Sequence, residues 1–175
     1  QEEVAHRPRQ YHRVQRATPP TQILSNGEYT VMMTIAGSGY SRYGDKAVSR
    51  WREDVTQDQW GQYFFIRDLR NGSLWSATYL PLPGEPEVYQ VDFAEDRIRY
   101  LREDDGILTE LEVIVVPDAA MELRRISLTN KSEVERELDV TSYFEAVLNS
   151  QGADQAHPAF SNLFVQTEYV QPLRT

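Results

Sequence analysis

The chain has 175 residues, a net charge of −9 and a hydrophobic content of 40%, which is enough for one globular domain with its own core. An acidic chain lacks the basic surface that nucleic-acid phosphates require, so nucleic acid is excluded as a partner. Cysteine is absent, which excludes disulfides and thiolate metal ligands, and no apolar run approaches the roughly 20 residues that span a bilayer.

The N-terminal segment differs in charge from the rest of the chain. Residues 1–22 carry four arginines against two glutamates, and prolines at positions 8, 19 and 20 interrupt them. A short, proline-broken basic run is typical of a linker that packs on something else. We therefore expect an N-terminal basic linker over residues 1–22 and a single domain over residues 23–175.

The chain from Leu24 onward is a succession of predicted strands joined by tight turns. A β-type run covers residues 29–36 after an Asn26-Gly27 turn, and Asn71-Gly72 and Asp105-Gly106 each separate two such runs. Asn-Gly and Asp-Gly are the strongest short hairpin signals because both turn positions require a positive φ. These turns predict antiparallel pairing.

The second half of the chain continues the same pattern. Residues 107–116 alternate apolar and acidic side chains, as a half-buried strand does, and a phase shift between Leu123 and Ile126 predicts a bulge. Apolar residues recur at two-residue spacing over 138–148, although residues 133–148 also contain helix formers. A last strand is expected over 160–170. Eight or nine strands with short turns predict an all-β antiparallel sandwich or barrel.

The glycine-rich stretch after the first strong strand resembles a phosphate-binding loop but fails both templates. In the dinucleotide fingerprint the third glycine is required, and Arg42 stands at that position after Gly37 and Gly39. In the P-loop spacing set by Gly39 and Gly44, Asp45 replaces the lysine. The stretch therefore predicts a turn and not a nucleotide site.

Catalytic and metal-binding chemistry has few candidates. The three histidines are His6, His12 and His157, and only the last lies outside the N-terminal segment. A metal site or a Ser-His-Asp triad would have to rest on His157, which precedes a proline in a predicted loop. We expect no metal site and no catalytic residue in this chain.

A dense group of aromatic and cationic side chains follows the glycine-rich turn. Its members are Tyr40, Arg42, Tyr43, Arg50, Trp51, Arg52 and Trp60. Flat rings that stack on sugar faces beside guanidinium groups form a carbohydrate-binding surface. The alternative is that the rings fill the core and the arginines pair with Glu53, Asp54 and Asp58.

Longer stretches of the chain resemble a known family. The sequence "ILSNGEYTVMMTIAGSGYSRYGDKAVSRWREDVTQDQWGQYFFIRD", followed by "LWSATYLP" and "HPAFSNLFVQTEY", resembles the cyclic β-1,2-glucan synthases. The match is to the start of their phosphorylase-like region, which is similar to cellobiose and chitobiose phosphorylases of glycoside hydrolase family 94. It runs from about residue 18 to residue 169, and Gly39-Tyr40-Ser41 with Arg50–Asp54 is its most specific part.

The resemblance implies a fold and also implies which domain of the parent enzyme carries the catalytic residue. The fold is an antiparallel β-supersandwich similar to galactose mutarotase, which precedes an (α/α)6 barrel. In that family the general acid is an aspartate of the barrel, and inorganic phosphate attacks the anomeric carbon with inversion. By this resemblance the chain is a non-catalytic sandwich domain of a glucan-processing phosphorylase or synthase. It has no cofactor of its own, and phosphate is a co-substrate of the parent enzyme.

The same resemblance implies partners, a location and site residues. The partners are the downstream barrel and a β-glucan oligosaccharide, with no direct membrane contact. We expect a soluble cytoplasmic fragment, incomplete at its C-terminus, whose parent is associated with the inner membrane through other regions. The residues expected to bind carbohydrate or the barrel are Tyr40, Ser41, Arg42, Tyr43, Arg50, Trp51, Arg52 and Glu168.

Two other functions remain open from the sequence. One is a free-standing carbohydrate-binding module, and the other is a mutarotase-like enzyme, for which only His157 is placed outside the N-terminal segment. If the aromatic–cationic segment serves a sugar cleft or a barrel interface, then Tyr40, Arg42, Arg50 and Arg52 should lie on one exposed edge. The competing interpretation predicts that Arg50 or Tyr40 is buried.

Overall fold

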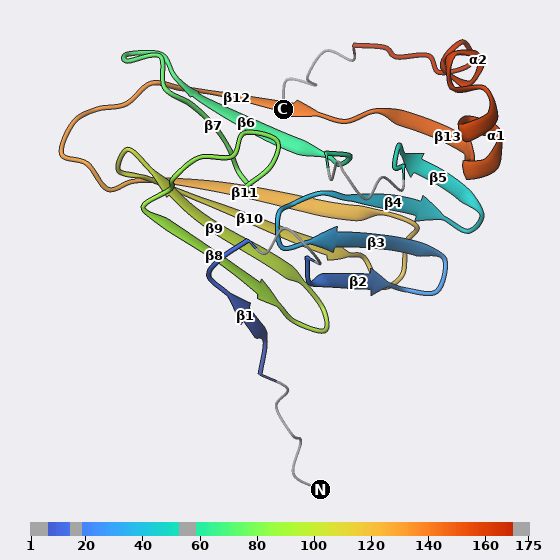
Figure 1. Ribbon diagram of the computed structural model, residues 1–175, viewed down its shortest axis with the longest axis horizontal. Helices are drawn as coiled ribbons and strands as arrows, with labels where there is room; N and C mark the ends of the chain where they lie inside the picture. Colours follow the sequence, from blue (N-terminus) through green and yellow to red (C-terminus); the bar gives the residue numbers. More distant parts are fainter. Residues whose placement is uncertain (1–6, 15–18, 53–58, 170–175) are drawn as a thin grey trace, which may run out of the picture.

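The computed structural model describes residues 7–14, 19–52 and 59–169, and the regular structure of this part of the chain consists almost entirely of antiparallel strands (Figure 1). Its strands are β1 (Arg9–Tyr11), β2 (Thr21–Ser25), β3 (Tyr29–Thr34), β4 (Gly39–Tyr43), β5 (Lys46–Ser49), β6 (Tyr63–Asp68), β7 (Leu74–Ser76), β8 (Val88–Phe93), β9 (Ile98–Asp104), β10 (Ile107–Val115), β11 (Glu122–Asn130), β12 (Leu138–Tyr143) and β13 (Ala146–Ser150). Two short helices follow, α1 (Gln151–Ala156) and α2 (Pro158–Asn162).

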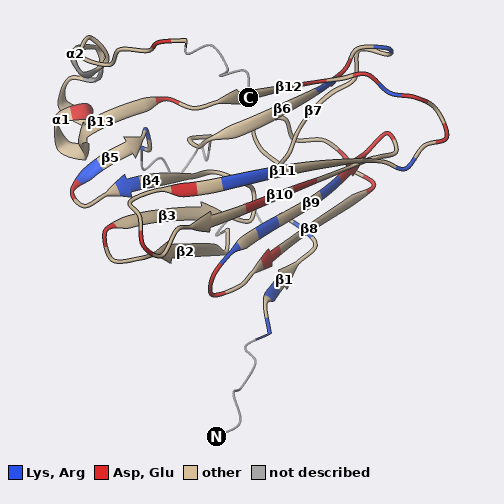
Figure 2. Cartoon of the chain, turned by 180° about the vertical axis from the view of Figure 1, so that it is seen from behind, with Lys and Arg blue, Asp and Glu red and all other residues tan. Residues whose placement is uncertain are grey.

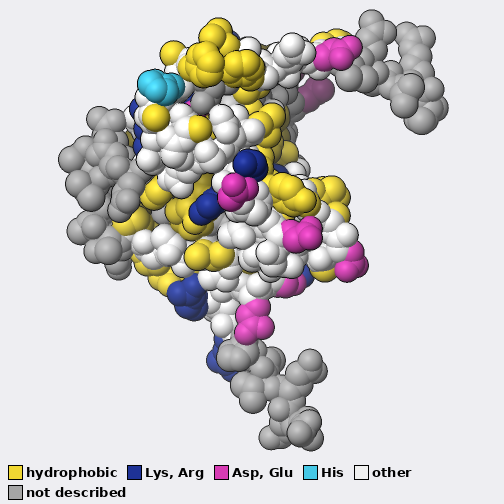
Figure 3. All heavy atoms as spheres, turned by 90° about the vertical axis from the view of Figure 1, so that its right-hand side faces the viewer, with side chains coloured by type: hydrophobic (Ala, Val, Ile, Leu, Met, Phe, Trp, Pro, Cys, Tyr) yellow, Lys and Arg dark blue, Asp and Glu magenta, His cyan; other side chains and the backbone are white. Residues whose placement is uncertain are grey.

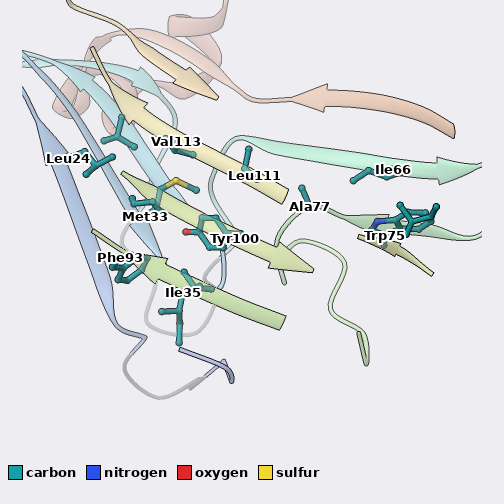
Figure 4. Close-up of a cluster of buried hydrophobic side chains, with 14 of the residues drawn as sticks. Leu24, Met33, Ile35, Ile66, Trp75, Ala77, Phe93, Tyr100, Leu111 and Val113 are labelled. Carbon is teal, nitrogen blue, oxygen red and sulfur yellow. The ribbon is translucent and has the colours of Figure 1, made fainter. Parts of the chain in front are cut away.

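The strands form three sheets that enclose one core. One five-stranded sheet has the order β1-β8-β9-β10-β11, the other has the order β13-β5-β4-β3-β2, and a three-stranded sheet has the order β12-β6-β7. Buried side chains from β2, β3, β6, β7, β8, β9 and β10 make up one hydrophobic cluster between them (Figure 4). The expected all-β antiparallel sandwich is confirmed.

Polar groups inside this core are satisfied across the sheets. The Tyr100 hydroxyl donates to the carbonyl of Thr34 at 2.6 Å, and Trp75 Nε1 donates to Thr109 Oγ1 at 3.1 Å. Each bond joins the five-stranded sheet of β9 and β10 to the opposite layer. Because an unpaired buried donor costs about 1–3 kcal/mol, these contacts also fix how the two layers are aligned.

The outward face of the β8–β11 sheet is a ladder of ion pairs (Figure 2). Arg99 contacts Glu110 at 2.8 Å and Arg97 contacts Glu112 at 3.3 Å, across the β9–β10 pair. The acidic residues that alternate along β10 therefore face outward, as their spacing predicted. Apolar partners such as Leu111 and Val113 fill the core on the other side.

The predicted turns are found where the sequence placed them. The β2–β3, β6–β7 and β9–β10 hairpins turn at Asn26-Gly27, Asn71-Gly72 and Asp105-Gly106. At the last of these both residues have positive φ, 50° for Asp105 and 72° for Gly106, which is the requirement that makes this dipeptide a hairpin signal.

Two local predictions in the second half are wrong. The β10–β11 register runs without a shift from Glu122 to Asn130, so no bulge lies between Leu123 and Ile126. The apparent phase shift arises because Arg124, a charged residue, takes an inward position, while Leu123 is 50% exposed. An irregularity lies instead in β13, between Ala146 and Asn149, where Leu148 has a φ of 55°.

The predicted last strand is also wrong. Within residues 160–169, Phe160–Asn162 belong to α2 and the remainder has no regular structure. The strand pattern expected over 138–148 is confirmed, because that range contains β12 and the start of β13, and the helix that was left open as an alternative is not formed.

The range expected as a linker contains strands in the structure. Residues 9–11 form β1, which pairs with β8, and β2 begins at Thr21. The ring of Tyr11 packs edge-on against Phe93 at 5.4 Å, and the guanidinium of Arg9 lies 5.6 Å from the same ring. Part of the basic segment is thus held on the edge of the β8–β11 sheet.

Candidate functional site

The glycine-rich stretch forms the tight connection between β3 and β4. A Cβ at Gly39 would lie 1.9 Å from the carbonyl oxygen of Met32, and one at Gly37, whose φ is 95°, would lie 2.3 Å from Thr78. These are positions that only glycine can occupy without displacing the backbone or a neighbour. A strand follows the turn and not a helix, so the stretch has no helix N-terminus with which to hold a phosphate.

Strand β4 separates the predicted site residues between two faces of its sheet. Ser41 pairs with Val31 and Tyr43 pairs with Tyr29, so both lie on the core side. Tyr40 pairs with Met32 and lies on the opposite side, with Arg42. The predicted residues 40–43 therefore do not form one surface, because neighbours along a strand point in opposite directions.

Ser41 belongs to a polar cluster between the sheets. Its hydroxyl donates to Glu122 at 3.0 Å and accepts from Gln62 at 3.0 Å, while Gln62 also donates to Glu122 at 2.9 Å. Arg124 contacts the same carboxylate at 3.3 Å. Burial, with a further contribution from the charge of Glu122, raises the pKa of Tyr29 above its ordinary value, and a hydrogen bond with Ser41 opposes that rise.

This cluster lies beside a shallow pocket of about 530 Å³. Tyr29, Tyr43, Lys46, Met121, Glu122 and Leu148 are among the residues that line it. The sequence singled out Tyr43 but gave no sign of Gln62, Glu122 or Arg124. Glu122 and Arg124 lie on β11 and Gln62 directly precedes β6, and only the packing of the layers brings them to Ser41.

Arg50 is a buried ion-pair centre and not an exposed contact. Only 7% of the residue is exposed, and its guanidinium bonds to Asp154 through Nε at 3.2 Å and Nη2 at 2.9 Å. It also donates to Glu145 and, at 2.7 Å, to Asn162. The hydrogen bond to Asp154 is the largest cause that raises the pKa of Arg50, against the effect of burial.

The expectation of a single exposed edge is therefore wrong for Arg50. This residue ties β5 to the segment after β12 and to both short helices. The expected acidic partners at positions 53, 54 and 58 lie outside the described residues. The partners that the structure does show come from the distant 145–162 region.

Tyr40, Arg42, Trp51, Arg52 and Trp60 remain as the candidate surface, which we call the aromatic–arginine surface. The rings of Tyr40 and Trp51 meet at 5.4 Å, and the guanidinium of Arg52 lies 5.5 Å from the ring of Trp60. A hydrogen bond from Gly39 N to Trp60 O at 2.8 Å holds Trp60 beside the glycine turn. All five side chains are partly exposed.

The two arginines of this surface keep unused hydrogen-bonding capacity. Nε of Arg42 and Nε of Arg52 are buried, and neither has a hydrogen-bond partner within the part of the chain that the structure describes. Guanidinium groups bind carboxylates and hydroxyl-rich ligands with fixed geometry, so the partly exposed side chains of Arg42 and Arg52 are suited to an acceptor on a ligand or partner.

A second pocket adjoins the aromatic–arginine surface at Trp60, which lines it. It has a volume of about 270 Å³, and its lining includes Trp60, Tyr63, Phe65, Tyr143, Arg50 and Glu145. Glu168, the remaining predicted site residue, is exposed in the segment after α2, and no hydrogen bond or ion pair joins it to this surface among the described residues.

The described ranges contain neither a metal-binding cluster nor a membrane-spanning helix. No group of three or more His, Asp or Glu side chains in residues 7–14, 19–52 and 59–169 is arranged to hold a metal ion. Within the same ranges, no helix is both long and apolar enough to cross a membrane.

The fold and the sequence place the chain in a family of carbohydrate-active proteins. A family model described as "Glycosyl hydrolase 94, supersandwich domain" matches residues 5–175, so the chain belongs to that family. This finding confirms the resemblance seen in the sequence.

Curated relatives include a synthase and several phosphorylases. The chain is 40% identical over 150 residues to cyclic beta-(1,2)-glucan synthase NdvB of Rhizobium meliloti (strain 1021), which covers 85% of this chain and 5% of that protein. It is 22% identical over 156 residues to N,N'-diacetylchitobiose phosphorylase of Vibrio furnissii, covering 86% of this chain and 20% of that protein. It is 31% identical over 83 residues to 3-O-beta-D-glucopyranosyl-beta-D-glucuronide phosphorylase of Paenibacillus borealis, with shares of 47% and 11%. The chain thus spans a small part of the length of each relative.

Proposed function

We propose that this chain is a non-catalytic sandwich domain of a longer glucan-processing phosphorylase or cyclic glucan synthase, in which it supports the sugar cleft of an (α/α)6 barrel. The aromatic–arginine surface carries the proposal. A pair of adjacent aromatic rings beside partly exposed guanidinium groups is suited to a carbohydrate or to a carboxylate-bearing partner surface.

The relatives support the same proposal. They are a synthase and phosphorylases, and the chain corresponds to 5% of the first and 20% of the second. In this proposal the partners are the barrel and a β-glucan oligosaccharide, phosphate is a co-substrate of the parent enzyme, and the parent works in the cytoplasm, attached to the membrane by other regions.

A turnover experiment tests the proposal. The 175-residue chain and the full-length parent are each incubated with β-1,2-glucan and inorganic phosphate, and release of sugar 1-phosphate is measured. We expect product from the parent and none from the chain. Sustained product from the chain, lost on Glu122→Gln, would contradict a non-catalytic role.

A free-standing carbohydrate-binding module is the second candidate, and the Tyr40–Trp51 ring pair is the observation that favours it. Titration of the 175-residue chain with β-1,2-glucan oligosaccharides separates the two. A module binds on its own and loses binding with Trp51→Ala, whereas a supporting domain binds only as part of the parent.

A further inference from the structure

Strand β12 is mostly exposed on both faces, and only Leu138, at its start, is half-buried against the core. Five of its six residues are exposed, with Val140 at 40% and Tyr143 at 49%. By contrast β10, with the same alternation of apolar residues, has a buried or half-buried residue at every position. A strand of a sandwich normally packs one face on the core, so β12 lacks a covering that the other strands have.

One edge of β12 also has no strand paired to it within the part of the chain that the structure describes. In the sheet order β12-β6-β7 it is the outermost strand, and in Figure 1 it lies between β6 and the segment that follows α2. Leu69 N donates to Glu137 O at 2.9 Å, which makes 69 and 137 a hydrogen-bonded pair of the β6–β12 ladder. Because such pairs alternate in antiparallel sheets, Asp139, Thr141 and Tyr143 bond to β6. The main-chain groups of Leu138, Val140 and Ser142 therefore point to the free edge.

The free edge has almost none of the devices that prevent strands from pairing. Native edge strands are protected by lysine, proline, a bulge or very short length. Strand β12 has six residues, one charge at Asp139, no lysine and no proline, and its register with β6 has no shift. The neighbouring edge strand β13 does carry an irregularity, at Leu148.

Apolar side chains continue beyond β12 on the same side of the molecule. The exposed ones are Phe144, Leu148, Phe160, Leu163 and Phe164. Figure 3, which views the right-hand side of Figure 1, shows hydrophobic side chains gathered over the end that carries α2. Exposed apolar surface of this extent is typical of an interface.

We propose that β12 receives an added antiparallel or parallel strand from the part of the parent chain that lies outside residues 1–175. This inference rests on the proposed function, and it names the way in which the domain joins the rest of its parent. The occupant is an extended segment that bonds to Leu138, Val140 and Ser142 and carries apolar residues that cover Val140 and Tyr143. The relatives supply the length of chain that this requires, since the described domain corresponds to only 5% or 20% of them.

Hydrogen exchange in the full-length parent tests the pairing. In a paired β12 all six amides of Leu138–Tyr143 exchange slowly, whereas in an unpaired one only those of Asp139, Thr141 and Tyr143 do. We expect the amides of Leu138, Val140 and Ser142 to exchange on the order of 100-fold more slowly than unstructured amides. Fast exchange at these three positions would overturn the proposal.

Proline substitution in the parent gives a second measurement with a matched control. Val140→Pro removes an outward N–H without touching the β6 ladder, so it should expose Leu138 and Ser142 to exchange. Ile23→Pro does the same on β2, another edge strand, because Asn26 N bonds to Tyr29 O and the outward groups of β2 are therefore those of Thr21, Ile23 and Ser25. We expect Ile23→Pro to leave exchange in β12 unchanged.

The dependence of amide protection on the concentration of the parent shows which chain supplies the added strand. Protection that is independent of parent concentration supports a strand from the same chain, whereas protection that is lost on dilution, as the parent dissociates, identifies a second copy and overturns the proposal. Release of sugar 1-phosphate, measured on the same samples, separates this result from the proposed function. A parent that is active but has fast-exchanging β12 amides refutes the pairing alone.

Discussion

Arg50 and Asp154 lie 104 residues apart in sequence and form a two-bond ion pair, with Nε to Oδ2 at 3.2 Å and Nη2 to Oδ1 at 2.9 Å. The side chains are 7% and 5% exposed. A paired guanidinium and carboxylate in such a place fix the relative position of β5 and α1. If either is removed, the other is left as an uncompensated buried charge.

We therefore expect Arg50→Ala to destabilise the chain by roughly 3–5 kcal/mol, the usual range for breaking a buried pair. Urea unfolding of the 175-residue chain measures this. Arg97→Ala is the control, because the Arg97 side chain is 48% exposed and its pairs with Asp96 and Glu112 lie on the surface of the sheet, where an ion pair contributes only about 0–1 kcal/mol. Equal effects of the two substitutions would show that Arg50 has no special structural role.

Replacement of Arg42, unlike that of Arg50, should reduce activity and leave stability nearly unchanged. Because Arg42 forms no ion pair among the described residues, Arg42→Ala should change the melting temperature of the chain little, while it lowers phosphorolysis by the parent at least about tenfold through loss of a charge-assisted contact. Arg67→Ala, which removes an exposed arginine of β6, is the control and should affect neither. A strong loss of stability with Arg42→Ala would remove the argument for a binding role.

Alanine substitution should have opposite effects on stability at two glycines, one in the β3–β4 turn and one in α1. Gly39→Ala would place Cβ 1.9 Å from the carbonyl of Met32, so it should destabilise by more than about 1 kcal/mol. Gly152→Ala, in α1, has no atom within 4 Å of the new Cβ and should stabilise by about 0.5–1 kcal/mol. Thermal melts of both variants test the pair, and a neutral Gly39→Ala would show that the turn can relax.

Acid stability should depend on Asp68, which is fully buried in β6. A hydrogen bond from the Arg70 backbone, aided by the Arg136 guanidinium, lowers the pKa of Asp68 below its ordinary value, against the effect of burial. A carboxyl with a lowered folded pKa stabilises the fold fully above its unfolded pKa of about 3.9, and this contribution is lost as the pH falls through the folded value.

The melting temperature should accordingly be insensitive to Asp68 titration between pH 7 and 5 and should fall below about pH 4. Asp68→Asn should lower the melting temperature at pH 7 and reduce its fall in acid. Melting curves from pH 7 to 2.5 provide the measurement. An unchanged acid dependence in the variant would mean that other carboxylates, such as Glu110 beside Arg99, control acid unfolding.

The sequence by itself determined the class of fold and most of its turns. Hairpins at Asn71-Gly72 and Asp105-Gly106 could be predicted because a turn of this kind depends on the φ preferences of two adjacent residues. The alternation along β10 was equally local. It set the inward and outward faces of the strand before any partner was known.

Only the tertiary structure decided which charged residues face inward. Arg42 and Arg50 are the same residue type eight positions apart, yet Nε of Arg42 has no hydrogen-bond partner among the described residues, while Arg50 is enclosed by Asp154 and Glu145. Likewise Arg124 faces inward at a position where the alternation of the sequence predicts an apolar residue. Its charge is tolerated there because the carboxylate of Glu122 pairs with it. The burial of a charge depends on a partner brought near by folding, and for Arg50 the partners lie 95 and 104 residues away, beyond the reach of any local pattern.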